Sequence, residues 1–127
     1  MLQIFFVGIG GFIGATLRYL INAYVQQFNK GLFFPWGTLT VNLLGCLLIG
    51  ILFQLNETQQ IFSPEIKNLI FIGILGSLTT YSTFSSDAIN LLLAQRYVAS
   101  MLYMFGHLFF GLFAVFLGRL VTSMVIQ

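Results

Sequence analysis

Four long apolar stretches, joined by short polar segments, constrain this chain more than any other feature of its sequence. A helix of about 20 apolar residues crosses a bilayer, so each stretch is long enough for one crossing. Charged residues make up only 6% of the chain, whereas soluble domains carry about 25%. The sequence therefore predicts an all-α membrane protein, in which residues 1–127 form a single domain of four transmembrane helices. The predicted spans are residues 2–25, 33–55, 66–94 and 98–126.

The few charged and nucleophilic residues exclude several classes of function. Five Lys and Arg residues are too few for the clustered basic surface that nucleic-acid binding requires. The single cysteine, Cys46, can form neither an intrachain disulfide nor a metal cluster. The sequence also lacks a nucleophile with a nearby base and a phosphate-binding loop, so we expect no enzyme activity. Only Glu57, Glu65 and Asp87 are acidic, and so few embedded carboxylates argue against a proton-coupled exporter.

The positive charges are divided almost evenly between the two sides of the membrane. If the first span starts on one side, Lys67 and Arg119 fall on that side, and Lys30 and Arg96 fall on the other. Because Lys and Arg in short loops normally favour the cytoplasm, this balance gives little preferred orientation. We therefore predict a dual-topology protein that pairs as an antiparallel homodimer around an axis in the membrane plane. The alternative is a single orientation, decided by a weak bias such as Arg18 in the first span.

The third apolar stretch has a polar centre, which is a poor surface to present to lipid. Seven Ser and Thr residues lie between Ser77 and Ser86, and Gly73 and Gly76 precede most of them. Glycine and β-branched threonine are weak helix formers, so we predict that the helix breaks near residues 76–80, at about mid-membrane. Such a break frees carbonyl groups, which attract small cations, and N–H groups, which attract anions. The alternative is a continuous helix whose hydroxyl groups bond back to its own carbonyls.

Five side chains inside the spans have polar or aromatic groups that need a partner. Tyr81 and Phe84 share a helix face, where they either pack or turn their positive ring edges toward a small anion. Asn42 either hydrogen-bonds a neighbouring helix or offers its amide N–H to an anion. Arg18 either draws anions into an aqueous vestibule or extends to the membrane interface. For His107 we expect an interhelical hydrogen bond.

Small residues recur at the spacing that lets helix backbones approach closely. Gly10 and Gly14 are four residues apart in the first stretch, and Gly45 lies in the second. Pairs of small residues at this spacing are common where helices meet inside membranes. We therefore expect these three glycines to be helix-packing positions.

Three sequence segments together carry a resemblance to a known family. They are GGFIGATLR at residues 10–18, GTLTVNLLG at 37–45 and GILGSLTTYSTFS at 73–85. On these segments, and over essentially its whole length, the chain resembles the bacterial Fluc (CrcB-type) fluoride channels. The resemblance implies a fluoride-specific channel of the bacterial cytoplasmic (inner) membrane, built as an antiparallel homodimer. It further implies passive export of fluoride down its electrochemical gradient, which lowers cellular fluoride and its toxicity.

The resemblance also implies roles for individual residues. It places the backbone carbonyls of Gly76 and Thr79 around a central sodium ion (Na+) that is structural and not transported. It assigns Arg18 to the vestibule. Position 81 is usually phenylalanine in this motif, so the added hydroxyl group of Tyr81 either donates to fluoride or turns the ring away. The fluoride pathway implied in this way contains Asn42, Tyr81, Ser82, Thr83, Phe84 and Tyr103.

Two other functions are weighed against the channel. A proton-coupled exporter would stop when the proton gradient is dissipated. A non-transporting scaffold would carry no flux and would tolerate Asn42→Ala or Phe84→Ala. The scarcity of embedded acids disfavours the exporter, and the concentration of hydroxyl groups in the third stretch disfavours the scaffold.

Overall fold

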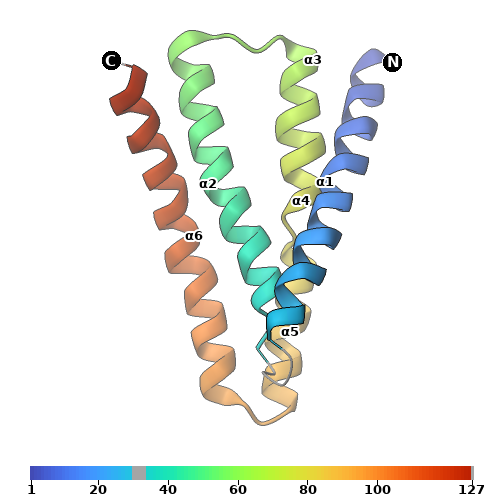
Figure 1. Ribbon diagram of the computed structural model, residues 1–127, viewed down its shortest axis with the longest axis vertical. Coiled ribbons are helices and arrows are strands. Elements are labelled where there is room, and N and C mark those ends of the chain that lie inside the picture. The colour runs from blue at the N-terminus through green and yellow to red at the C-terminus, as the bar shows by residue number, and fades with distance from the viewer. Residues whose placement is uncertain (30–33, 127) are drawn as a thin grey trace.

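Four long helical segments make up the structure, a computed structural model that describes residues 1–29 and 34–126. They run alternately up and down, so both termini lie at the same end of the molecule (Figure 1). Each segment is long and apolar enough to cross a membrane, which confirms the predicted all-α, four-span membrane protein. The segments are α1 (Leu2–Phe28), α2 (Trp36–Gln59), a third segment (Pro64–Leu93) and α6 (Tyr97–Ile126).

The first two helices extend beyond their apolar stretches. α1 continues to Phe28 instead of ending at residue 25, and α2 continues to Gln59 instead of residue 55. Glutamine is a good helix former, so polar residues at the edge of a span prolong the helix. Gln60, the residue after α2, adopts a left-handed φ of 49° and caps the helix. The connecting segments after these two spans therefore begin later than predicted.

The third and fourth segments differ from the prediction by one or two residues. The third begins at Pro64, because the fixed φ of proline suits the first helical position, and it ends at Leu93. α6 begins at Tyr97. The predicted start of the second span, residue 33, lies outside the described residues, as does Lys30.

The first half of the third segment is irregular helix. A short helix, α3 (Pro64–Lys67), leads into a π-helical stretch, η1 (Asn68–Leu75), and then into a last turn, α4 (Gly76–Leu78). π-helical turns are rare and are found frequently at functional sites. Nothing in the sequence pattern predicts this stretch.

The third segment is broken after α4. Thr79 and Thr80 adopt extended backbone, with ψ angles of 156° and 116°, before α5 (Tyr81–Leu93) begins. This extended link lies partway along the segment, between α4 and α5 (Figure 1). The predicted break is therefore present, and the alternative of a continuous helix is wrong.

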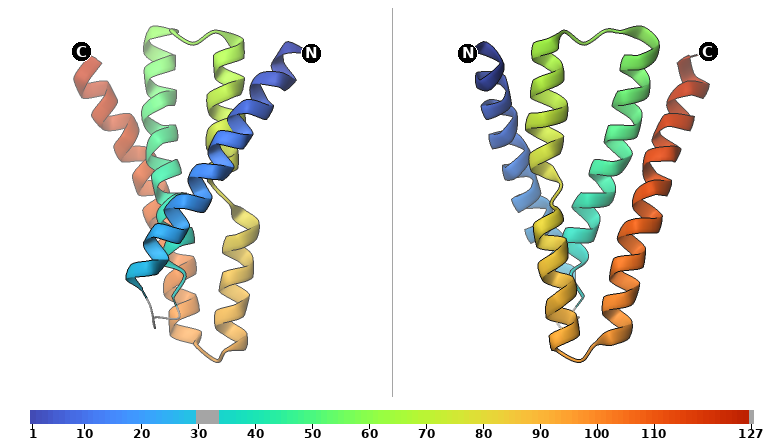
Figure 2. Two further views of the ribbon diagram at one scale, coloured as in Figure 1. Left: turned by 45° about the vertical axis from the view of Figure 1, so that its right-hand side comes forward. Right: turned by 180° about the vertical axis from the view of Figure 1, so that it is seen from behind.

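Glycines bring the helices into backbone contact in two pairs. α1 crosses the first half of the third segment, and α6 runs along α2 (Figure 2). A Cβ atom at Gly14 would lie 2.1 Å from the carbonyl oxygen of Ile74 in η1. In the second pair, a Cβ atom at Gly118 of α6 would lie 2.5 Å from the carbonyl oxygen of Leu47 in α2. Neither contact leaves room for a side chain, so these glycines set how closely the helices approach.

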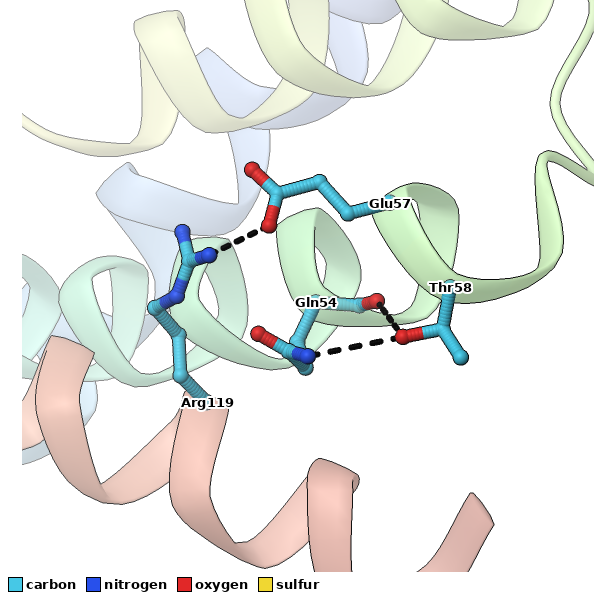
Figure 3. Close-up of polar contacts among 4 residues, drawn as sticks. All are labelled: Gln54, Glu57, Thr58 and Arg119. Carbon is cyan, nitrogen blue, oxygen red and sulfur yellow. Dashed lines mark hydrogen bonds and ion pairs between the residues drawn. The ribbon is translucent and has the colours of Figure 1, made fainter. Parts of the chain in front are cut away.

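The end of the molecule that carries the termini has an exposed polar cluster. Arg119 of α6 forms an ion pair with Glu57 of α2 (Figure 3). One turn of α2 away, the hydroxyl group of Thr58 donates to the carbonyl of Gln54 (2.9 Å; Figure 3). Arg96 lies in the turn between α5 and α6, at the opposite end of these helices. Positive charge is therefore present at both ends, as the sequence analysis expected.

Candidate functional site

Asn42 of α2 clamps the break in the third segment. Its Oδ1 accepts a hydrogen bond from the N–H of Thr80 (2.8 Å), and its Nδ2 donates to the carbonyl of Thr80 (3.1 Å). A backbone N–H can only donate, so this pairing also fixes which end of the amide is the oxygen. The amide nitrogen carries two protons, and only one is used here. Asn42 can thus hold the break and still offer a donor to an anion, so the two interpretations of this residue are compatible.

Two carbonyl groups beside the break lose the donors that a continuous helix would give them. In such a helix the N–H of Thr80 would donate to Gly76, and the N–H of Thr83 would donate to Thr79. Instead, the Thr80 N–H donates to Asn42, and the Thr83 N–H donates to the hydroxyl group of Thr80 (3.3 Å). The carbonyls freed in this way include those of Gly76 and Thr79, the two residues implied to hold Na+. Oxygen ligands of this kind suit a small hard cation.

Thr79 is held in place on both sides. Its hydroxyl group donates to the carbonyl of Leu75 (3.0 Å). Its methyl group lies against Gly45 of α2, where a Cβ atom would be only 2.2 Å from Thr79 Cγ2. Gly45 therefore gives the extended link the room to pass close to α2.

The start of α5 presents donors. Thr80 caps the helix, and its hydroxyl group lies 3.0 Å from that of Thr83 and 3.3 Å from that of Ser82. The N–H groups of Tyr81 and Ser82 belong to the first turn, so they have no carbonyl four residues back in the same helix. The positive end of the helix dipole lies here as well. This set of hydroxyl and N–H groups is suited to a small anion.

Phe84 lies at the centre of a cluster of rings. Its centroid is 4.4 Å from that of His107 and 5.6 Å from those of Tyr81 and Tyr103. Tyr103 is completely buried, whereas Tyr81 is 81% exposed in the single chain. The structure therefore brings the three predicted pathway rings together, with Tyr81 on the open side.

A groove of about 740 Å³ collects most of the predicted residues on one face. Its walls come from α2, from both sides of the break and from α6. Ser82, Thr83 and Tyr103 are not part of the lining, but they contact it through Thr80 and Phe84. The predicted residues in the lining are Asn42, Gly45, Gly76, Thr79, Tyr81 and Phe84.

The structure does not bring Arg18 to the groove. Arg18 lies partly buried on α1 and is absent from the groove lining. It also forms no ion pair with any carboxylate of the described residues. Its role as a vestibule residue stays a prediction.

Asp87 joins three helices in a cluster that the sequence analysis did not predict. Its Oδ2 accepts hydrogen bonds from the hydroxyl groups of Thr38 on α2 (2.8 Å) and Tyr103 on α6 (3.1 Å). A carboxylate inside a span must find hydrogen-bond donors, so the sequence alone indicates that Asp87 has polar partners. The identity of the donors depends on how α2 and α6 pack against α5.

Comparison with known proteins identifies the family. The model of the family described as "CrcB-like protein, Camphor Resistance (CrcB)" matches residues 5–119. The chain belongs to the CrcB family. It is similar to a protein of Methanosarcina acetivorans named "Fluoride-specific ion channel FluC 1". The two sequences are 42% identical over an aligned region that covers 94% of this chain and 90% of the relative. A "Fluoride-specific ion channel FluC" of Shewanella halifaxensis is 43% identical and covers 94% of each chain, and one of Shewanella pealeana is 46% identical over 81% of each.

Membership of the CrcB family agrees with two expectations. The resemblance to the Fluc (CrcB-type) channels, stated from three sequence segments, is confirmed. The relatives are named as ion channels, so the expectation that this CrcB protein is not an enzyme is confirmed as well. Together with its four spans, the family makes it a multi-pass membrane protein.

Proposed function

We propose that this protein is a passive, fluoride-specific channel that works as an antiparallel homodimer. The observation that carries the proposal is the break at Thr79 and Thr80, which is clamped by Asn42 beside Phe84. Asn42, the threonines of the break and the rings of Tyr81 and Phe84 all line one groove. The names of the relatives support fluoride as the permeant ion.

Fluoride suits these groups because of its size and basicity. It is a small, strong hydrogen-bond acceptor, and losing its water is costly unless several close donors replace that water. The candidates on this chain are the unused amide proton of Asn42, the first N–H groups of α5 and the hydroxyl groups of Ser82 and Thr83. The ring edges of Tyr81 and Phe84 add weaker positive potential.

The groove supports the proposed pairing. It is open in the single chain, and hydroxyl and backbone groups that line it, such as those of Thr79 and Thr80, would be costly to leave against lipid. A second copy in the opposite orientation would cover the groove, while the outer apolar faces contact the bilayer. The freed carbonyls of Gly76 and Thr79 from each copy would hold one structural Na+, which supplies positive charge at the interface and does not move through the pathway.

The proposed direction of transport follows from acid–base chemistry and the membrane potential. Fluoride enters a cell as its neutral acid and dissociates in the less acidic cytoplasm, where the anion is trapped. A passive channel in the bacterial cytoplasmic membrane lets the negative interior potential drive the anion out. The channel would thereby lower cellular fluoride and its toxicity without an energy source of its own.

The test is fluoride efflux from liposomes that contain the purified protein. The vesicles are loaded with potassium fluoride, and efflux is recorded with a fluoride electrode after a potassium ionophore is added. We expect rapid efflux that requires the potassium ionophore, persists with a proton ionophore and is small for vesicles loaded with chloride. Phe84→Ala should slow the efflux. Leu44→Ala, on α2 and outside the groove lining, should not.

Three outcomes separate the alternatives. Loss of efflux when the proton gradient is dissipated would favour a proton-coupled exporter. No efflux from well-folded dimers would overturn the homodimeric channel. Equal fluoride and chloride efflux would leave a channel but contradict its specificity.

A further inference from the structure

His107 packs against both Phe84 and Tyr103. Its centroid is 4.4 Å from Phe84 and 4.4 Å from Tyr103, with ring planes inclined by 46° and 73°. It also lines the groove together with Asn42 and Phe84. A change in the charge of His107 would therefore act directly beside the proposed fluoride pathway.

The hydrogen bonds of His107 determine where its proton lies. The Nδ1 atom is 3.0 Å from the backbone carbonyl of Tyr103, one turn earlier in α6. A carbonyl oxygen can only accept, so the neutral ring carries its proton on Nδ1. The expected interhelical hydrogen bond of His107 is therefore wrong, because the bond lies within its own helix.

The second ring nitrogen has no partner. Nε2 is buried and makes no hydrogen bond to any described residue. In the neutral ring it is an acceptor with no donor to satisfy it, which is unfavourable for a buried polar atom. Protonation would convert Nε2 into a donor.

One charged group and two further titratable groups lie near His107. Asp87 of α5 is the nearby carboxylate, linked to Tyr103 on the same helix as His107. Tyr81 on α5 and Cys46 on α2 are the other titratable groups of the groove lining. No lysine or arginine lines the groove in the part of the chain that the structure describes. A protonated His107 would be the one cation of that lining, and Phe84 offers it a ring face.

We propose that His107 is a proton-controlled positioning residue of the fluoride pathway. In the neutral state it packs Phe84 in place and adds no charge. In the protonated state it adds a positive charge beside Phe84 and Asn42, which raises the occupancy of the groove by fluoride. Histidine is the side chain whose ordinary titration lies closest to neutral pH, so mild acidification increases the flux when fluoride is below saturation. This inference rests on the proposed fluoride channel.

The first test compares fluoride efflux at two pH values, each equal on both sides of the liposome. Efflux through the unchanged protein should be several-fold faster at about pH 5.5 than at about pH 7.5. Efflux through His107→Gln and through His107→Phe should each be the same at both pH values, whatever its absolute rate. The phenylalanine variant keeps the ring packing but cannot titrate, so it separates charge from structure. Protein-free vesicles correct for fluoride that crosses the lipid as the neutral acid.

The second test observes the proton directly. His107 is the only histidine of the chain, so the protein labelled with 15N-histidine gives one pair of ring-nitrogen signals. We expect the Nδ1–H form at neutral pH and a titration whose midpoint coincides with that of the flux.

The two tests together decide the inference. A flux that ignores pH while His107 titrates would overturn it, as would a histidine-free variant that keeps the pH profile of the unchanged protein. If neither variant folds, the comparison of the two midpoints in the unchanged protein still decides. No fluoride efflux at any pH would instead contradict the proposed function.

Discussion

The partly buried carboxylate of Asp87 illustrates how single residues stabilise this fold. It accepts two hydroxyl donors from two different helices, Thr38 and Tyr103. Tyr103 is completely buried, so no water can replace its hydroxyl group if that group is removed. Each of these donors therefore contributes to the stability of the α2, α5 and α6 contact.

Tyr103→Phe should destabilise the protein by about 1–3 kcal/mol, because hydrogen bonds to charged groups are stronger than average. The ring and its packing stay, so the loss reports on the hydroxyl group alone. The measurement is thermal unfolding in detergent micelles. Tyr24→Phe is the matched control, since Tyr24 is exposed on α1. Equal shifts for the two variants would contradict the role of the Asp87 cluster.

At the scale of the helices, the contact between α1 and η1 depends on the absence of side chains. A Cβ atom at Gly14 would meet the backbone of Ile74, and one at Gly10 would lie 2.3 Å from the carbonyl oxygen of Leu69. Backbone atoms cannot move aside as a flexible side chain can. A larger residue must therefore push the two helices apart.

Gly14→Ala should destabilise the protein by about 1–3 kcal/mol, the range for an overpacked interior. Gly8→Ala on the same helix should be neutral or stabilising, because a Cβ atom at Gly8 meets nothing within 4 Å and alanine favours the helix. Both variants are compared by their thermal unfolding. A smaller loss for Gly14→Ala than for Gly8→Ala would refute the close α1–η1 contact.

For the whole molecule, the distribution of charge predicts two orientations in the membrane. Positive residues lie at both ends of the described chain, Arg119 at one end and Arg96 at the other. The ion pair of Arg119 with Glu57 is about half exposed, and such pairs contribute little to stability. No strong charge asymmetry therefore fixes how the chain inserts.

We expect about half of the chains to expose the end of α2 to each side of the membrane. Cys46 is the only cysteine, so the double substitution Cys46→Ser and Gln59→Cys leaves one exposed thiol at that end. A membrane-impermeant maleimide applied to intact spheroplasts should label about half of this thiol, and the rest after lysis. Labelling of nearly all or nearly none before lysis would show a single orientation.

The break in the third segment could be predicted because its cause is local. Glycines, β-branched threonines and a run of hydroxyl groups weaken the helix at the same place where Thr79 and Thr80 are extended. The four spans could be predicted for a similar reason, since length and apolarity belong to each stretch by itself. The chemistry of single residues did not show which polar and aromatic side chains are functional. The resemblance to the Fluc (CrcB-type) channels indicated those candidates.

The contacts across helices could not be predicted in the same way. The pairing of Asn42 with Thr80 joins residues 38 positions apart, and it depends on the register between α2 and the break. The same is true of Thr38 with Asp87, 49 positions apart. The π-helical stretch η1 is almost entirely apolar and carries no local signal for its unusual hydrogen bonding. These features follow from packing, which spacing along one segment does not encode.

The double hydrogen bond between Asn42 and Thr80 has a consequence for the way mutants of this protein are interpreted. One amide holds the main chain in its extended form and also faces the groove, so a substitution at position 42 alters architecture and chemistry at once. A slow Asn42 variant is thus ambiguous when only its flux is known. Hydrogen exchange at the Thr80 amide resolves the ambiguity, because it reports the clamp alone. The flux of an Asn42 variant should therefore be interpreted only together with a measurement of its structure at Thr80.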